Sequence, residues 1–422
     1  MSDDVALLLR RAGFGPTSRE LQAARGAGYD ATVTTLTTPP GPDLGATSAP
    51  VPQLGPDPFL DLRNPTTTQT QAASAKRQAM TLQMTQWWLD RMTAADHQAV
   101  EKLVFFWHGH WATSIGRVGS PPLMLTQHLT LRNSPDFVAM AHAMVRDPAL
   151  IIWLDGHYNT ATAPNENLAR ELMELFTLGV GHYTEADVKQ AARALTGWRI
   201  DHRLRSAVLD TARFDPGSKS ILGVMAAFSA DDLVDLLVRQ PACPRFIATR
   251  LWFRYASSSQ PVPDSVLARM VGAFPAPLAM LGALFSDPAF QTTAGTLVKQ
   301  PIEWLVGAMR QLSIRPGGIA AATFADMVAK LEIMGQRPFA PPNVGGWPSG
   351  AAWLTSAAAL VRLRLARTLA DLAAVGRNTP ENVAFLLGID RWSNRTYAVL
   401  RGVRDARLLL ALGLVSPEYL VT

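Results

Sequence analysis

The sequence predicts an all-α fold, a large multi-helix globular domain with long Pro/Gly-rich loops. Apolar residues recur at helical spacing through most of the chain, and long alternating runs of β-branched residues are absent. The composition, 48% hydrophobic and 17% charged, is typical of a globular protein, and 422 residues can form one large domain or two ordinary ones. The chain has no internal repeat of fixed period, so a solenoid is not predicted.

The first part of the chain is expected to hold a series of helices and one long loop. An N-terminal helical pair occupies residues 1–38, with Ser18 as a candidate cap of its second helix. Residues 39–70 are rich in Pro, Gly, Thr and Ser and predict an extended surface loop. Helices are predicted over 3–12, 18–27, 72–94, from His97 into the motif at 106–114, twice within 122–147, and over 150–154.

The chain is organised around residues 165–198. A helix over 165–176 has an apolar stripe, and its opposite face carries Glu166, Asn167, Arg170, Glu171 and Glu174. On this face Arg170 lies four residues from two glutamates, the spacing at which helical side chains meet.

A second helix is predicted directly after this face. Thr184 and Asp187 have the spacing of an N-cap and an N3 residue, so the helix begins near Glu185 and ends near Gly197. Polar groups therefore converge near the Gly/His/Tyr turn that joins the two helices.

The remainder is predicted to be a helical half over 223–422, packed on a central core at 71–222 as one continuous domain. Residues 199–222 are expected to be irregular. The apolar segment 357–375 is too interrupted by arginines to cross a membrane. Helices are predicted over 230–239, 244–256, 264–273, 276–286, 297–313 and 322–334.

The charge and the cysteine content argue against several classes of protein and of site. The net charge of +5 is small for this length, and no basic run or basic–aromatic repeat indicates nucleic-acid binding. The single cysteine, Cys243, excludes an internal disulfide and a cysteine-based zinc cluster. The N-terminal residues lack the order of a secretory signal, so a cytoplasmic location is expected.

His108 and His110 are candidate metal ligands, or a general base with its orienting partner. On a continuous helix, side chains at i and i+2 diverge by roughly 200°, so both can face one ligand only if the helix ends at Gly109. A divalent metal would then need a third ligand, from Glu171, Glu174 or His182. The alternative is a pair of helix-end histidines packed against neighbouring tryptophans.

The carboxylate face is the main catalytic candidate. Arg170 lowers the pKa of a neighbouring carboxylate and crowding of like charges raises that of another, which can separate a general acid from a general base. The alternative is a solvated face of helix-stabilising ion pairs. Candidate substrate-binding residues nearby are Asn165, Asn167, Asp155, His182 and Tyr183.

Two further sequence patterns each have both a functional and a structural interpretation. A Pro/Gly-rich segment contains Asn343, Trp347 and Trp353. It can line a pocket, in which the tryptophans would stack on sugar rings, or its tryptophans can pack in the core and hold the loop in place. Asp231, Asp232 and Asp235 match the aspartate-rich pattern with which class I terpene synthases hold magnesium. Ser229 and Asp232 equally have capping-box spacing.

Four ordered motifs resemble a bacterial family described as domain of unknown function 1800. They are Leu8–Thr17 (LLRRAGFGPT), Phe106–Ser114 (FWHGHWATS), Asn165–Trp198 and Pro341–Pro348 (PPNVGGWP). The resemblance covers nearly the whole chain and implies no particular reaction. Its members are often exported and are often encoded beside a phosphatase- or sulfatase-like family, which implies a protein partner. The family usually has a His-Asp pair where this chain has Phe214 and Asp215.

These patterns predict an enzyme. It would use Glu166, Glu171, Glu174, Arg170 and His108 for acid–base or metal-assisted hydrolysis or elimination on a polar, carbohydrate-like substrate. The alternatives are a non-catalytic binding or assembly protein whose polar face is a structural network, and a magnesium-dependent isoprenoid enzyme.

Overall fold

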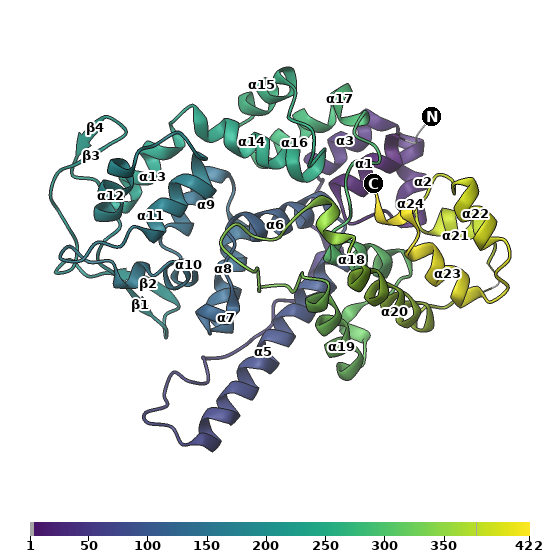
Figure 1. Cartoon of the computed structure of the whole chain (residues 1–422), viewed down its shortest axis with the longest axis horizontal. Coiled ribbons are helices and arrows are strands. Elements are labelled where there is room, and N and C mark those ends of the chain that lie inside the picture. The colour runs from purple at the N-terminus through teal and green to yellow at the C-terminus, as the bar shows by residue number, and fades with distance from the viewer. Residues whose placement is uncertain (1–3, 377) are drawn as a thin grey trace.

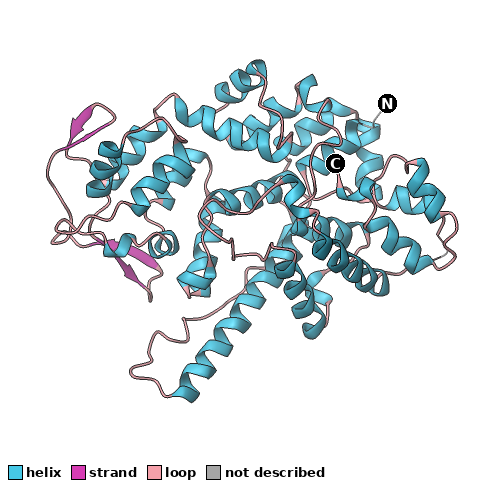
Figure 2. Ribbon diagram, in the orientation of Figure 1, coloured by secondary structure: helices cyan, strands magenta, loops and turns pink. Residues whose placement is uncertain are grey.

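Helix α6 (Gln98–His110) runs through the middle of the computed structural model, with the other elements arranged around it (Figure 1). The structure describes residues 4–376 and 378–422. Within them the protein is mainly helical, with 24 α-helices, and the strands form only two small hairpins (Figure 2). The helical prediction is confirmed in this coarser form.

The N-terminal region contains more helix than the sequence predicted. The side chain of Thr17, and not Ser18, caps α2 by accepting the Glu20 amide at 3.2 Å. The predicted loop over 39–70 is interrupted by a short helix and by the first turn of α5, which projects with its loop from the body (Figure 1). The bounds are α1 (Asp4–Ala12), α2 (Ser18–Ala27), α3 (Tyr29–Thr37), α4 (Leu44–Thr47) and α5 (Thr67–Ala94).

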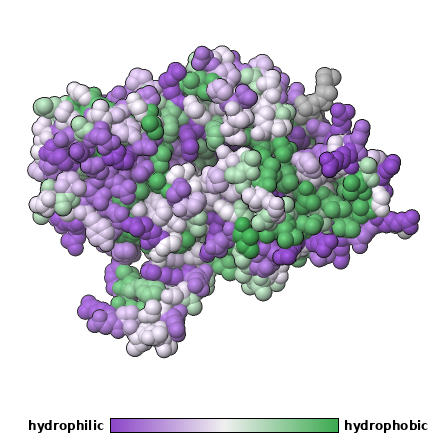
Figure 3. Space-filling model, viewed as in Figure 1, coloured by the Kyte–Doolittle hydropathy of each residue, from purple (hydrophilic) through white to green (hydrophobic). Residues whose placement is uncertain are grey.

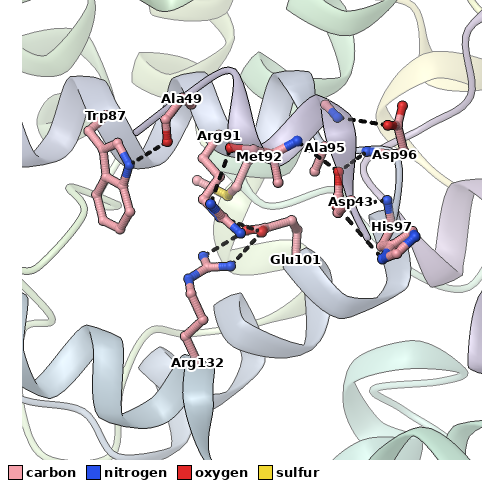
Figure 4. Close-up of polar contacts among 12 residues, drawn as sticks. Asp43, Ala49, Trp87, Arg91, Met92, Ala95, Asp96, His97, Glu101 and Arg132 are labelled. Atoms are coloured by element: carbon pink, nitrogen blue, oxygen red, sulfur yellow. Dashed lines mark hydrogen bonds and ion pairs between the residues drawn. The ribbon is translucent and has the colours of Figure 1, made fainter. Parts of the chain in front are cut away.

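Two carboxylate networks, of which that of Glu101 is buried, fix the start of α6 (Figure 4). Glu101, 1% exposed, accepts hydrogen bonds from Arg91 on α5 and from Arg132 on α8 (Pro121–Asn133), at 2.5–2.9 Å. Asp43 accepts the backbone amides of Asp96 and His97 at 2.9 and 3.0 Å. These contacts tie α6 to three other helices because a buried carboxylate requires cationic or amide donors.

The predicted helix over 165–176 is two elements. The α-helical turn α11 (Asn167–Glu171) passes into a π-helix, η2 (Leu172–Thr177), in which the Thr177 hydroxyl donates to the Leu172 carbonyl at 2.6 Å. The other bounds of this region are α7 (Ile115–Val118), α8 (Pro121–Asn133), α9 (Phe137–Met144), α10 (Pro148–Trp153), η1 (Gly156–Tyr158) and α12 (Glu185–Ala194).

The predicted start of α12 at Glu185 is confirmed, including the capping box of Thr184 and Asp187, but the helix ends at Ala194. The prediction of irregular structure over 199–222 is wrong. Two antiparallel hairpins lie there, β1 (Trp198–Asp201) with β2 (Ser206–Leu209), and β3 (Lys219–Ile221) with β4 (Val224–Ala226). Strands of three or four residues are too short to show an alternating pattern.

Helices fill the rest of the chain. Their bounds are α13 (Ala230–Val238), α14 (Ala242–Tyr255), α15 (Asp264–Gly272), α16 (Pro277–Phe285), α17 (Pro288–Gln291), α18 (Pro301–Gln311), η3 (Pro316–Gly318), α19 (Ala321–Ile333), η4 (Gly350–Trp353), α20 (Ser356–Leu372), α21 (Pro380–Leu386), α22 (Asn394–Leu400), α23 (Ala406–Leu414) and α24 (Pro417–Leu420). None of the described helices combines the length and apolar character that a membrane crossing requires.

Two hydrophobic cores meet at α6. The first is built mainly from α9–α16 and contains Phe106 and Trp107, whereas the second is built mainly from α5, α8 and α18–α23 and contains Phe105. Exposed apolar side chains such as Leu360 and Phe385 lie on the second half, and apolar surface gathers over the C-terminal helices on the face shown in Figure 3.

Arg11 of the opening motif joins the chain ends. Its guanidinium donates to the carbonyls of Tyr255, Ala256, Thr293 and Thr422 at 2.5–3.0 Å. This motif therefore has a structural role, since both terminal nitrogens of the buried guanidinium are paired with carbonyls, while its Nε atom has no partner among the described residues.

Candidate functional site

The two histidines of the second motif point to different cores. Helix α6 continues through Gly109 to His110, so the geometry that would let both imidazoles face one ligand is not present. The Nε2 atom of His108 accepts the Phe339 amide at 3.1 Å, and the ring packs edge-on against Trp88 with centroids 4.7 Å apart. The Nε2 atom of His110 lies 3.0 Å from the carbonyl of Phe176 on the π-helix.

Burial keeps both imidazoles neutral. It lowers the pKa of His108 to about 3, and burial followed by the nearby charge of Arg250 lowers the pKa of His110 to about 3. The described residues contain no group of three or more His, Cys, Asp or Glu side chains arranged to hold a metal ion. The metal role of His108 and His110 therefore stays a prediction.

The late motif packs directly on α6. Gly346 has φ +85°, and a Cβ there would lie 2.5 Å from the carbonyl oxygen of Gly109. The glycine lets the loop reach the helix backbone and seats Trp347 against His108, with ring centroids 5.5 Å apart. Sequence motifs more than 200 residues apart thus form one wall.

Two neighbouring cavities lie beside this wall. The arginine cavity has a volume of about 90 Å3 and is lined by Phe105, Phe106, Gly109, His110, Arg250, Phe253, Arg254, Gln300, Gly345, Trp347, Pro348 and Ser349. The glutamate cavity has a volume of about 140 Å3 and is lined by His110, Glu174, Leu175, Gly179, Val180, Phe246, Arg250, Val344 and Gly345. His110, Arg250 and Gly345 belong to both, so the two cavities form one cleft.

Two polar atoms of the shared residues have no partner. Since the Phe176 carbonyl can only accept, His110 carries its proton on Nε2 and presents Nδ1 as an acceptor. This Nδ1 atom and the Nε atom of Arg250 are buried and have no hydrogen-bond partner among the described residues. Other buried atoms of the described residues, such as Arg11 Nε and Trp111 Nε1, also lack a partner, so these two indicate a bound group because their residues line the cleft.

Glu174 brings the predicted carboxylate face to the cleft. It lies on the π-helix, lines the glutamate cavity and accepts the Tyr183 hydroxyl at 2.6 Å. Burial, and then the charge of Glu174, raise the pKa of Glu171, one helical turn earlier. Single π-helical turns are frequent at functional sites, and here one carries the carboxylate that reaches the cavity.

Arg170 is engaged away from both cavities. It donates to Glu166 at 3.0 Å, which confirms the predicted pair, and to both carboxylate oxygens of Glu185 at 2.7 Å. The predicted pairing of Arg170 with Glu174 is wrong, because Glu174 is bonded to Tyr183 instead.

The other substrate-binding candidates do not line either cavity, with the exception of Trp347. Asn165 caps the amide of Asn167 at 3.0 Å, Asp155 pairs with Arg117, and Asn343 accepts the Gly345 amide at 2.9 Å. His182 is exposed on the turn. Their substrate-binding roles stay predictions.

The three aspartates of the terpene-synthase pattern are occupied by protein contacts. Asp231 and Asp235 each lie 3.0 Å from one ring nitrogen of His142, and Asp232 forms a capping box with Ser229. The magnesium-binding interpretation stays a prediction that these contacts do not favour.

Asp215, next to Phe214, accepts a hydrogen bond from Arg193 at 2.7 Å, so it stabilises the loop that follows β2. Phe214 lies under the ammonium group of Lys219, 5.2 Å from its ring centroid.

The sequence interpretation missed the two arginines of α14. Arg250 and Arg254 lie four residues apart on one helix, a like-charge pair that is destabilising without compensation. This spacing was a usable signal, but the side chains that neutralise Arg254 come from a distant helix.

The comparisons with known proteins agree with the motifs. A family model described as "Protein of unknown function (DUF1800)" matches residues 7–421. The chain belongs to the DUF1800 family. A search of curated proteins and a search of solved structures found no match. The match therefore establishes the family but gives no activity, so a function has to be argued from the residues of the cleft.

Proposed function

We propose that this DUF1800 protein is an enzyme that performs acid–base hydrolysis or elimination on a polar, carbohydrate-like substrate in the cleft. The observation that supports it is the convergence of three distant motifs on two buried, unpartnered polar atoms, His110 Nδ1 and Arg250 Nε. Each such atom costs about 1–3 kcal/mol when unpaired, and a substrate that pairs both recovers this cost.

Glu171 and Glu174 are the acid–base pair of the proposal. Burial and the charge of Glu174 raise the pKa of Glu171, which is the direction expected of a general acid, although Glu171 itself lines neither cavity. Glu174 faces the cavity and is oriented by Tyr183, so it is placed to take a proton from a substrate or water. Tyr183 acts as a positioning residue.

His110 accepts a hydrogen bond and does not act as the base. With a pKa of about 3 it is too weak a base at neutral pH, where an effective general base has a pKa near the working pH. Its free Nδ1 lone pair is suited to a substrate hydroxyl.

The test is turnover on a panel of chromogenic glycosides, esters and uronides. Glu174→Gln and Glu171→Gln should each lower kcat by at least about 100-fold, the usual contribution of a general acid or base. Glu332→Gln, an exposed carboxylate paired with Arg337, is the matched control and should retain activity. Wild-type rates in both glutamate variants would rule out the proposed mechanism.

A binding or assembly function is the second candidate. It is favoured by the pairing of Arg170 with Glu166 and Glu185 at the surface, because these ion pairs engage the guanidinium that the enzymatic prediction required for catalysis. Under this function no panel member would be turned over, and a partner protein would bind the wild type.

A further inference from the structure

Arg250 is a largely buried cation without a counter-ion. It lies on α14, it forms no ion pair among the described residues, and its buried Nε atom has no hydrogen-bond partner there. Burial lowers the pKa of this guanidinium, as expected where solvent is withdrawn and no anion replaces it. Protein structures normally pair buried charges.

The neighbouring carboxylates do not neutralise Arg250. Glu303 accepts from Arg254 at 3.1 Å and also pairs with Lys102, so one negative charge serves two cations. Glu174 shares the glutamate cavity with Arg250 but makes no ion pair with it. The arginine cavity therefore holds an excess of positive charge.

The shape and chemistry of this cavity limit what can supply the missing anion. A volume of about 90 Å3 is smaller than the cavity of about 150 Å3 that accepts benzene, so it admits one small group such as a carboxylate or sulfate. Trp347 and Phe106 provide apolar walls, and Ser349 provides a hydroxyl. The His110 Nδ1 atom next to Arg250 needs a donor, which a hydroxyl group provides.

We propose that Arg250 binds the oxyanion of a hydroxylated acid, such as an acidic sugar, while His110 accepts a hydrogen bond from a hydroxyl of the same molecule. This assignment deepens the proposed function, because it names the substrate class of that cleft. It differs from the sequence expectation, in which Arg170 was the arginine of the catalytic group, since Arg170 already binds two carboxylates.

The experiment measures thermal unfolding of the full chain with D-glucuronate, D-glucose, sulfate and chloride at equal ionic strength. Wild type should gain at least about 2 °C in Tm with saturating glucuronate and less with glucose. Arg250→Met, which removes the charge and keeps an apolar stem, should lose this gain. Arg245→Met, an exposed arginine on the same helix, should keep it.

Each outcome decides the proposal. An Arg250-dependent gain with both anions, or with glucuronate alone, supports it. An equal gain in Arg250→Met, no gain in wild type, or an Arg250-dependent gain with sulfate alone overturns the hydroxy-acid assignment. Generic stabilisation by sulfate appears in every variant and is subtracted.

Failure of the enzymatic proposal is measured separately. Glu174→Gln should keep the glucuronate gain while losing turnover. If the Tm gain with glucuronate is retained but no protein turns over any substrate, the anion site is supported and the proposed enzymatic function is contradicted.

Discussion

At the residue scale, buried arginines differ in the partners that the fold gives them. Arg11 donates to four backbone carbonyls and Arg310 pairs with Glu20, so these side chains stabilise the fold. Arg250 has neither kind of partner among the described residues. A group that the fold leaves unsatisfied is more readily explained by a ligand than by stability.

Asp147 gives a residue-scale prediction about pH. Burial raises its pKa to about 7, against smaller opposing effects of its hydrogen bonds with the Leu150 amide and Gln127. The folded state therefore keeps a proton that the unfolded chain releases near pH 4. The stability contributed by the neutral acid is present below pH 4 and is lost as pH rises to about 7.

Asp147→Asn should remove this pH dependence, because asparagine stays neutral and retains an acceptor. Relative to wild type, its free energy of unfolding should rise between pH 4 and pH 7, by an amount on the order of 4 kcal/mol, and stay level above. Urea unfolding at several pH values measures it. A constant difference across this range would show that Asp147 is ionised in the fold.

At the element scale, the late motif and α6 form the wall of the cleft through glycine contacts. Gly346 approaches the Gly109 carbonyl too closely for any side chain. This contact explains why a Gly-Gly pair precedes Trp347, and it relates the fold to the position of the indole ring.

Gly346→Ala should therefore destabilise the protein more than a positive φ alone does. Gly181 is the control, since it has φ +88° and a Cβ added there would meet no atom within 4 Å. We expect Gly181→Ala to lower the free energy of unfolding by about 1 kcal/mol. Gly346→Ala should lower it by roughly 3 kcal/mol or more, because the added methyl group also clashes with the backbone of α6. Denaturant titrations compare them, and equal losses would mean that the loop moves freely away from α6.

The sequence predicted elements whose signals are local. The start of α12 and the capping boxes at Thr184 and Ser229 follow from side chains three residues apart. The π-helix and the short hairpins were missed because each element has too few residues for its periodicity to be recognised in the sequence. Arg250 was missed because its lack of a partner is a property of tertiary packing.

At the scale of the whole molecule, the cleft lies where two hydrophobic cores meet. His108 packs with Trp88 of the second core and His110 with Trp107 of the first, so a single helix brings both sides together. The predicted convergence of polar groups near the signature motif holds for Glu174. The predicted sharing of one ligand by the two histidines does not, since α6 is continuous through both.

If the junction of the two cores binds a ligand through Arg250, the unpaired cation should cost stability in the ligand-free protein. The most direct measurement is the free energy of unfolding of ligand-free Arg250→Met against wild type. Replacing an unpaired buried charge by an apolar side chain should leave stability unchanged or raise it, by up to about 2 kcal/mol. A loss of about 2 kcal/mol or more would show that Arg250 holds the fold together, and would contradict the account.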